Sequence, residues 1–178
     1  AALAALGEVD VFVLGDPRLE SELTPPAGLA VARLGHAGRA DRRETRLDQL
    51  RTLVPGAQPS SMRRQDHAPT RAAFTTWGPG SYDLAWFVRI ESWTALGALV
   101  DAPAIIDYDD LRDQLVMSRL RSAWRYPTER GSRAGPAALA RRLARAEARA
   151  WERLQRRTAR EVAAVVVCSE MDRAHLGV

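Results

Sequence analysis

Three aspartates lie in one short turn directly after an apolar run, and they are the residues of this sequence best suited to chemistry. Asp107, Asp109 and Asp110 follow the run 104–106. Carboxylates on one turn can hold a divalent cation and a diphosphate through oxygen ligands. They can equally orient hydroxyl groups or act as a base, and Asp109 or Asp110 is also placed to cap a helix that begins at Leu111. The residues alone leave these alternatives open.

A second polar turn lies earlier in the sequence and, like the aspartates, directly follows an apolar run. Arg89 and Glu91 follow the run 83–88, and the segment 93–99 has the apolar spacing of a short helix. A strand, a helix and the strand 104–106 predict a βαβ unit with parallel strands. In such sheets ligands bind outside the carboxyl ends of the strands. Both polar turns are therefore expected at one edge of the sheet.

The elements before this unit are shorter and less regular. Residues 9–14 read as a buried strand and residues 29–34 as an edge strand. The capping-box spacing of Asp41 and Glu44 predicts a helix to about residue 54. The apolar stripe of that helix consists of Leu47, Leu50 and Val54. Two further helices are expected over 60–67 and 70–77. Residues 1–6 resemble a helix end stopped by Gly7, so we expect one strand and most of a helix to precede residue 1.

The elements after the acidic turn are regular. Helices are expected over 111–124 and 136–161, a loop over 128–136, and a buried strand over 163–167. Ser169 is placed to cap a final helix. Apolar strands alternating with helices predict an α/β fold: a Rossmann-like parallel sheet with helices on both faces, lacking its first strand.

Composition limits the fold and the classes of function. The 178 residues are 46% hydrophobic and 27% charged, which suits one domain. All 26 basic residues are arginines and the net charge is +4, a bias typical of a GC-rich coding genome. The lone Cys168 excludes an internal disulfide and predicts a packed small residue in a reducing compartment. No apolar run approaches the roughly 20 residues that span a bilayer.

Three other features each have a structural and a functional interpretation. The arginine-rich helix 141–160 favours a solvated helix face over a nucleic-acid site. Trp124 and Tyr126, flanked by arginines, favour ordinary packing over a membrane anchor. The three histidines share no ligand spacing, so no zinc site is expected.

The order of these features resembles a known family. A strand with an Arg-x-Glu turn, a strand with an acidic turn, the sequence WERLQRR at 151–157 and the ending AAVVVCSEMDRAHLGV at 163–178 are similar to the N-terminal domain of family 4 glycosyltransferases with the GT-B fold. The resemblance is good over 82–178 and most specific over 165–178. In that family a strand ending in valine and Ser-Glu, followed by a helix closing on Leu-Gly-Val, precedes the crossover to the second domain.

The resemblance implies an enzyme of two Rossmann-like domains facing a cleft. Residues 1–178 would be the single N-terminal, acceptor-side domain, and the nucleotide-sugar donor would be held by an absent C-terminal domain. It implies a bacterial, cytoplasmic glycosyltransferase that can contact the inner face of the membrane, with a nucleotide sugar as co-substrate and no obligatory metal or other cofactor. The acceptor would be a glycan, a lipid or a small molecule, and the isolated fragment is expected to be inactive.

In such a domain, the polar residues at the strand ends of this sequence are expected to form the site. Asp109 and Asp110 are the expected catalytic residues. The remaining residues expected to line the acceptor cleft are Arg89, Glu91, Asp107, Tyr108, Ser169 and Glu170. No catalytic histidine is carried over, because the positions where the family often has one hold other residues here. The alternatives are a metal-dependent GT-A transferase using Asp107 and Asp109, and a non-enzymatic arginine-rich domain binding nucleic acid or a membrane surface.

Overall fold

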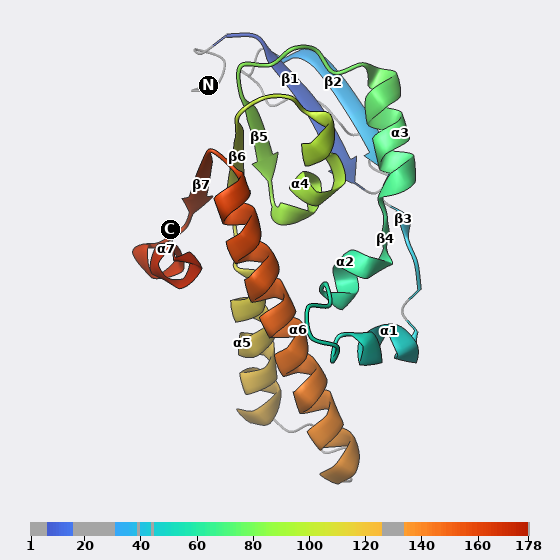
Figure 1. The fold of residues 1–178 in the computed structure, drawn as a ribbon, viewed down its shortest axis with the longest axis vertical. Helices are drawn as coiled ribbons and strands as arrows, with labels where there is room; N and C mark the ends of the chain where they lie inside the picture. Colours follow the sequence, from blue (N-terminus) through green and yellow to red (C-terminus); the bar gives the residue numbers. More distant parts are fainter. Residues whose placement is uncertain (1–6, 16–30, 39, 44, 126–133, 178) are drawn as a thin grey trace.

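The centre of the computed structural model is a parallel sheet of three strands. The structure describes residues 7–15, 31–38, 40–43, 45–125 and 134–177. Strands β5 (Ala85–Val88), β6 (Ala104–Tyr108) and β7 (Ala164–Val167) pair in the order β5-β6-β7 (Figure 1). Helix α4 (Ile90–Leu96) and the short helix η3 (Gly97–Leu99) connect β5 to β6. The predicted βαβ unit is confirmed, although its helix begins three residues earlier than expected.

A second parallel pair of strands comes from the start of the chain. Strands β1 (Val9–Gly15) and β2 (Val31–Gly38) pair along their whole length, and α3 (His67–Trp77) packs beside β2. Gly35 is required in this contact, because a Cβ atom there would lie 2.5 Å from the Phe12 ring and 2.7 Å from the Trp77 ring. The strand predicted over 29–34 corresponds to β2, which covers Val31–Gly38; residues 29 and 30 lie outside the described residues.

The fold is α/β with parallel strands, as predicted, but a continuous sheet is not confirmed. Among the described residues the strands form a two-stranded sheet β1-β2, a three-stranded sheet β5-β6-β7 and a small antiparallel pair of β3 (Ala40–Asp41) with β4 (Gln65–Asp66). Among the described residues, the Tyr82 hydroxyl in the segment before β5 donates a 3.0 Å hydrogen bond to Asp10 of β1.

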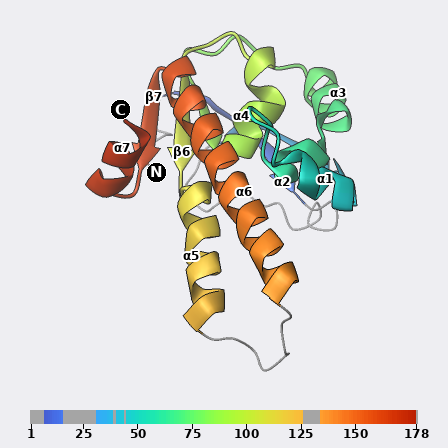
Figure 2. The ribbon, with the colours of Figure 1, turned by 60° about the horizontal axis from the view of Figure 1, so that its bottom comes forward.

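Two antiparallel helices extend away from the sheet. Helix α5 (Arg112–Arg125) lies along α6 (Ala134–Glu161), the longest helix (Figures 1 and 2). Both follow their predicted bounds closely, and most of the loop expected between them lies outside the described residues. No helix in the described part of the chain has the length and apolar character needed to cross a bilayer.

The core lies between the three-stranded sheet and the helices around it. The largest of its fully buried apolar side chains are Ile90, Ile106 and Leu176. Leu176 belongs to α7 (Glu170–Leu176), which begins where predicted: the Ser169 hydroxyl accepts a 3.1 Å hydrogen bond from the Asp172 amide. Ser169 is thus confirmed as the cap of the final helix.

The helix predicted from Asp41 to residue 54 is corrected by the structure. Helix α1 covers only Arg46–Arg51, followed by α2 (Ser60–Arg64). The reciprocal capping pair is Thr45 with Asp48, since the Asp48 amide donates to the Thr45 hydroxyl at 3.2 Å and the Thr45 amide to the Asp48 carboxylate at 3.1 Å. The spacing of three residues was correct, but it was assigned to the wrong pair.

Candidate functional site

The carboxyl ends of β5 and β6 bring the two predicted polar turns together. Val88, the last residue of β5, is in register with Asp107 of β6, so the residues that follow each strand emerge side by side. The Arg89 guanidinium lies 3.7 Å from the Asp109 carboxylate. Both side chains are more than half exposed, so the ion pair adds little stability and both groups remain accessible to a ligand.

The backbone at Arg89 is strained. Arg89 has φ 69° and ψ 153°, a region that is almost restricted to glycine. The turn is held in this shape by its neighbours: the Arg89 amide donates to the Asp107 carbonyl at 2.9 Å, and the Ser92 hydroxyl donates to the Arg89 carbonyl at 2.8 Å. Strain of this kind concentrates at functional sites, and here it fixes the position from which the Arg89 side chain leaves the sheet.

Glu91 lies deeper than Arg89 and has a partner that the sequence did not single out. Its carboxylate accepts a 2.8 Å hydrogen bond from Arg112 in the first turn of α5, and its side chain is 14% exposed. The second carboxylate oxygen is buried and has no hydrogen-bond partner among the described residues. Arg112 carried no signal of its own, because arginines are frequent throughout the chain.

Two shallow pockets open at this edge of the sheet. The first, of about 50 Å³, is lined by Arg89, Ile90, Glu91, Tyr108, Asp109, Asp110 and Arg112. The second, of about 110 Å³, shares Arg89 and Glu91 and adds residues from β1, β4 and α3, including His67. Pockets that enclose a small organic ligand measure on the order of 300 to 1,000 Å³. These pockets can therefore form one wall of a ligand site, but they do not enclose a ligand.

The three aspartates do not converge on one point. Asp109 and Asp110 are exposed and line the first pocket, whereas Asp107 is a strand residue that lines neither pocket. Among the described residues no group of three or more His, Cys, Asp or Glu side chains is arranged to hold a metal ion. Asp109 and Asp110 are thus presented to a ligand as separate hydrogen-bonding carboxylates.

Tyr108 lines the first pocket with a buried side chain. Its hydroxyl donates a 3.3 Å hydrogen bond to the Gln155 carbonyl on α6, directed into the protein. Burial raises the pKa of Tyr108 far above its ordinary value, and the Glu161 and Glu91 carboxylates raise it further. Tyr108 therefore stays neutral at physiological pH and serves as a structural wall of the pocket.

The end of β7 adds a third polar segment at the same edge, outside both pockets. Ser169 caps α7, and Glu170 is 83% exposed and pairs with Arg173. Cys168 is exposed, which corrects the expectation of a packed side chain, and its thiol donates to the Asp109 carbonyl at 3.1 Å. This contact connects the end of β7 to the acidic turn.

The site combines two exposed carboxylates with two arginines on a concave edge of a parallel sheet. Carboxylates accept hydrogen bonds from hydroxyl groups and guanidinium groups donate to oxygen atoms, so the surface suits a polyhydroxylated molecule. The interpretation of Trp124 and Tyr126 is not tested, because the side chain of Trp124 and the whole of Tyr126 lie outside the described residues.

Comparison of the chain with models of protein families, with curated proteins and with solved structures finds no match in any of the three.

Proposed function

We propose that this chain is the acceptor-side domain of a glycosyltransferase with the GT-B fold. The observation that carries the proposal is the convergence of polar turns at the carboxyl ends of consecutive parallel strands. Arg89 and Glu91 leave β5, and Asp109 and Asp110 leave β6, at one concave edge. This is the edge at which open α/β sheets bind ligands, and its side chains suit the hydroxyl groups of an acceptor.

The order of the strands supports a Rossmann-like sheet. Six strands of a doubly wound sheet usually follow the order 3-2-1-4-5-6. In this order β1 and β2 would be the second and third strands, and β5, β6 and β7 the fourth, fifth and sixth. Removal of the first strand from such a sheet leaves two separate groups, β2-β1 and β5-β6-β7, which are the two parallel sheets of the structure. That strand would lie between β1 and β5, and the hydrogen bond from Tyr82 to Asp10 brings the segment before β5 to β1.

The shallow pockets fit a domain that supplies one side of a cleft. In this proposal Asp109, paired with Arg89, orients the acceptor hydroxyl, and Asp110 takes its proton during transfer. Arg89 contacts acceptor oxygens, while Arg112 holds Glu91 in place in the wall of the pocket. The nucleotide-sugar donor is held by a second domain outside these 178 residues.

The test measures sugar transfer by a protein that contains both domains. A panel of nucleotide sugars is offered with glycan, lipid and small-molecule acceptors, and release of the nucleotide is followed. Asp110→Asn is expected to lower kcat/KM by about 100-fold, in the usual range for a general base. Asp101→Asn is the matched control, because Asp101 is exposed before β6, at the opposite edge of the sheet. An Asp110→Asn enzyme as active as the Asp101→Asn enzyme contradicts the assignment.

The isolated 178-residue chain is expected to transfer no sugar, because the donor site is not in it. Turnover of any nucleotide sugar by this chain alone contradicts the two-domain proposal.

A further inference from the structure

The apolar residues of α1 and of the turn after it are exposed, although the spacing of Leu47, Leu50 and Val54 predicts a buried stripe. Leu47 is 67% exposed, Leu50 45%, Leu53 43% and Val54 57%. Isolated exposed leucines are ordinary, but four large apolar side chains within eight residues form a patch. We call Leu47, Leu50, Leu53 and Val54 the leucine patch.

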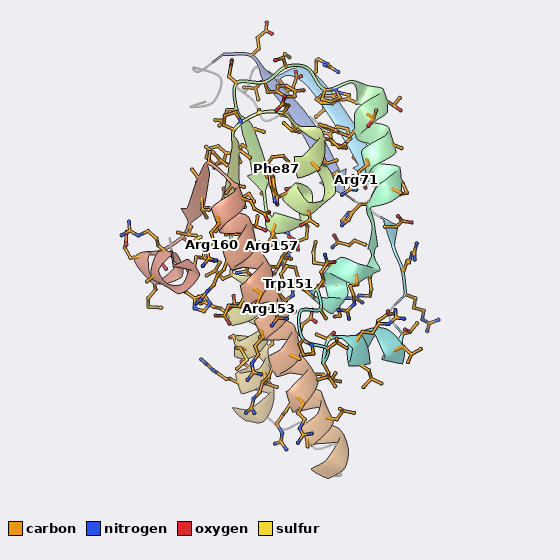
Figure 3. The ribbon with its side chains drawn as sticks, in the orientation of Figure 1. Arg71, Phe87, Trp151, Arg153, Arg157 and Arg160 are labelled. Atoms are coloured by element: carbon orange, nitrogen blue, oxygen red, sulfur yellow. The ribbon has the colours of Figure 1, made fainter. Side chains whose placement is uncertain are left out.

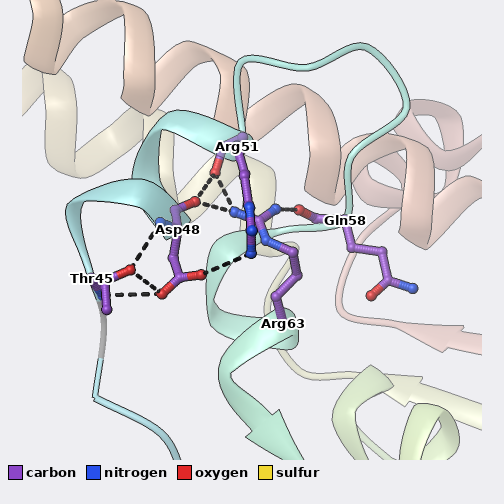
Figure 4. A network of polar contacts seen from close by, with 6 residues as sticks. Thr45, Asp48, Arg51, Gln58 and Arg63 are labelled. Atoms are coloured by element: carbon purple, nitrogen blue, oxygen red, sulfur yellow. Dashed lines mark hydrogen bonds and ion pairs between the residues drawn. The ribbon is translucent and has the colours of Figure 1, made fainter.

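Polar contacts connect α1 and the turn after it to α2 (Figure 4). Arg63 of α2 donates to the Asp48 carbonyl, and at 2.9 Å to the Thr52 hydroxyl. Asp48 pairs with Thr45 at the start of the helix, and these hydrogen bonds lower the pKa of the Asp48 carboxyl. Because these contacts bind the polar side of α1 to α2, its leucines remain free for an external partner.

A row of arginines runs along the neighbouring helix α6. Arg142, Arg145, Arg149, Arg153 and Arg160 are exposed and recur at intervals of three, four or seven residues, which places them on one face. At 1.5 Å per residue the row is roughly 27 Å long. Within the described residues the side chains of Arg142, Arg145, Arg149 and Arg160 form no ion pair or hydrogen bond. We call the five exposed arginines, with Arg153 included, the arginine row. Arg153 and Arg160 are labelled in Figure 3.

The leucine patch and the arginine row belong to adjoining parts of the molecule. Arg153 donates a 3.3 Å hydrogen bond to the carbonyl of Ala57, three residues after the patch ends. The Ser60 amide, at the start of α2, donates to the Glu147 carboxylate of α6 at 2.9 Å. In Figures 1 and 2 α1 and α2 lie beside α6, on the side away from α7. The leucine patch and the arginine row therefore lie on neighbouring elements of the fold.

We propose that this combined surface binds an anionic phospholipid bilayer. The leucines enter the interface between headgroups and acyl chains, and the arginines contact lipid phosphates, a division typical of interfacial helices. A nucleic acid would use the arginine row but leave four apolar side chains exposed to water. A bilayer uses both features, which is why we commit to it. The inference does not depend on the proposed glycosyl transfer.

The test is cosedimentation of the full chain with vesicles, without any nucleotide sugar. Vesicles of phosphatidylcholine alone are compared with vesicles that also contain phosphatidylglycerol. Binding is expected only with phosphatidylglycerol and is expected to weaken as salt is added, because screening reduces the attraction of the arginines. Absence of binding to the anionic vesicles overturns the proposal.

Two variants separate the contributions. Leu47→Ser with Leu50→Ser is expected to weaken binding to anionic vesicles at least tenfold. Arg142→Gln with Arg145→Gln and Arg149→Gln is expected to weaken it about fivefold for each arginine removed. Because all five positions are exposed, the variants are expected to fold, which circular dichroism checks. Met171→Ser, at an exposed position on α7, is the matched control and is expected to bind as the unaltered protein does.

Insertion is measured directly with a fluorophore on position 50. In a Cys168→Ser background, Leu50→Cys is labelled with a dye whose emission shifts to the blue in an apolar environment. A blue shift with phosphatidylglycerol vesicles is expected for this protein and not for one labelled at Met171→Cys. Binding of duplex DNA with equal affinity before and after the leucine substitutions, together with no shift at position 50, would assign the surface to nucleic acid. A dimer that Leu47→Ser with Leu50→Ser dissociates, without vesicle binding, would assign it to a second copy.

Discussion

The Glu91 carboxylate accepts a 2.8 Å hydrogen bond from the Arg112 guanidinium and so joins the first turn of α4 to the first turn of α5. These turns follow the two strands whose ends carry the candidate site. The pair is mostly shielded from water, with Glu91 14% and Arg112 30% exposed. The Glu91–Arg112 pair therefore fixes how the polar turns face one another. The exposed ion pairs of this protein are too weak to do so.

Substitution of Glu91 tests the strength of this connection. Glu91→Gln leaves the guanidinium of Arg112 without its partner charge, and we expect the free energy of unfolding to fall by about 1 to 3 kcal/mol. Urea unfolding followed by tryptophan fluorescence measures the change. Glu170→Gln is the control, since Glu170 is 83% exposed in its pair with Arg173, and its effect should stay within about 0.5 kcal/mol. Equal effects of the two substitutions would show that the Glu91 pair has no structural role.

The strain at Arg89 predicts a difference between two substitutions that remove the same side chain. Arg89→Gly and Arg89→Ala both lose the guanidinium, but only glycine adopts φ 69° with ψ 153° without strain. We expect the glycine variant to be more stable than the alanine variant by about 1 kcal/mol, measured by urea unfolding. Ser118→Gly and Ser118→Ala, on an exposed face of α5, provide the control, where alanine should be the more stable. Equal free energies of unfolding for Arg89→Ala and Arg89→Gly would rule out backbone strain at position 89.

Local patterns in the sequence were sufficient for the elements that carry the site. The apolar runs before Arg89 and Asp107 are strands, and the serine before α7 is its cap, because each signal depends on neighbouring residues alone. Contacts between distant residues were not accessible in this way. Arg112 meets Glu91 across 21 residues and Gln155 across 43. No spacing rule selects those partners in a chain with so many arginines.

The leucines of α1 show that local patterns do not predict burial either. Leu47, Leu50 and Val54 have the period of a buried face, but periodicity states only which side chains share a face. Whether that face is covered depends on what packs against it, and here α2 packs against the polar side. The division of the strands into two parallel sheets is likewise a property of strand order, which apolar runs do not encode.

Gln155 is a buried polar residue on which α5 and α6 both depend. Its side chain is almost completely buried, accepts a 3.0 Å hydrogen bond from the Arg112 amide and donates to Asp113 at 3.2 Å. Asp113 in turn lies 2.6 Å from His175 of α7. The network therefore connects α5, α6 and α7 beneath the candidate site.

Replacement of Gln155 by leucine keeps the volume but leaves the Arg112 amide and the Asp113 carboxylate with unmet hydrogen bonds. We expect Gln155→Leu to lower the free energy of unfolding by about 2 to 4 kcal/mol. Gln58→Leu is the matched control, because Gln58 is exposed, and should change stability by no more than about 0.5 kcal/mol. A Gln155→Leu protein as stable as the control would mean that the network contributes nothing.

The raised pKa of Tyr108 predicts a loss of stability at alkaline pH. Burial is the main cause of the shift, so the folded protein keeps the phenol neutral where the unfolded chain, with its ordinary value near 10.0, releases the proton. The stabilisation is complete below that pH and is lost progressively as the pH rises above it. Tyr82, whose pKa burial also raises, contributes in the same direction. Tyr108→Phe should therefore flatten the decline in urea midpoint between about pH 9 and pH 11.

The quantity to compare between the variants is the slope of the urea midpoint against pH, and not the stability at neutral pH. Tyr108→Phe also removes the hydrogen bond to the Gln155 carbonyl, which lowers stability by a similar amount at every pH below the titration. Tyr82→Phe is the matched control and should flatten the decline less, because the shift at Tyr108 is much the larger. If Tyr108 titrates at its ordinary pH in the folded protein, seen as phenolate absorbance before unfolding, its side chain is in contact with water and not a buried wall of the pocket.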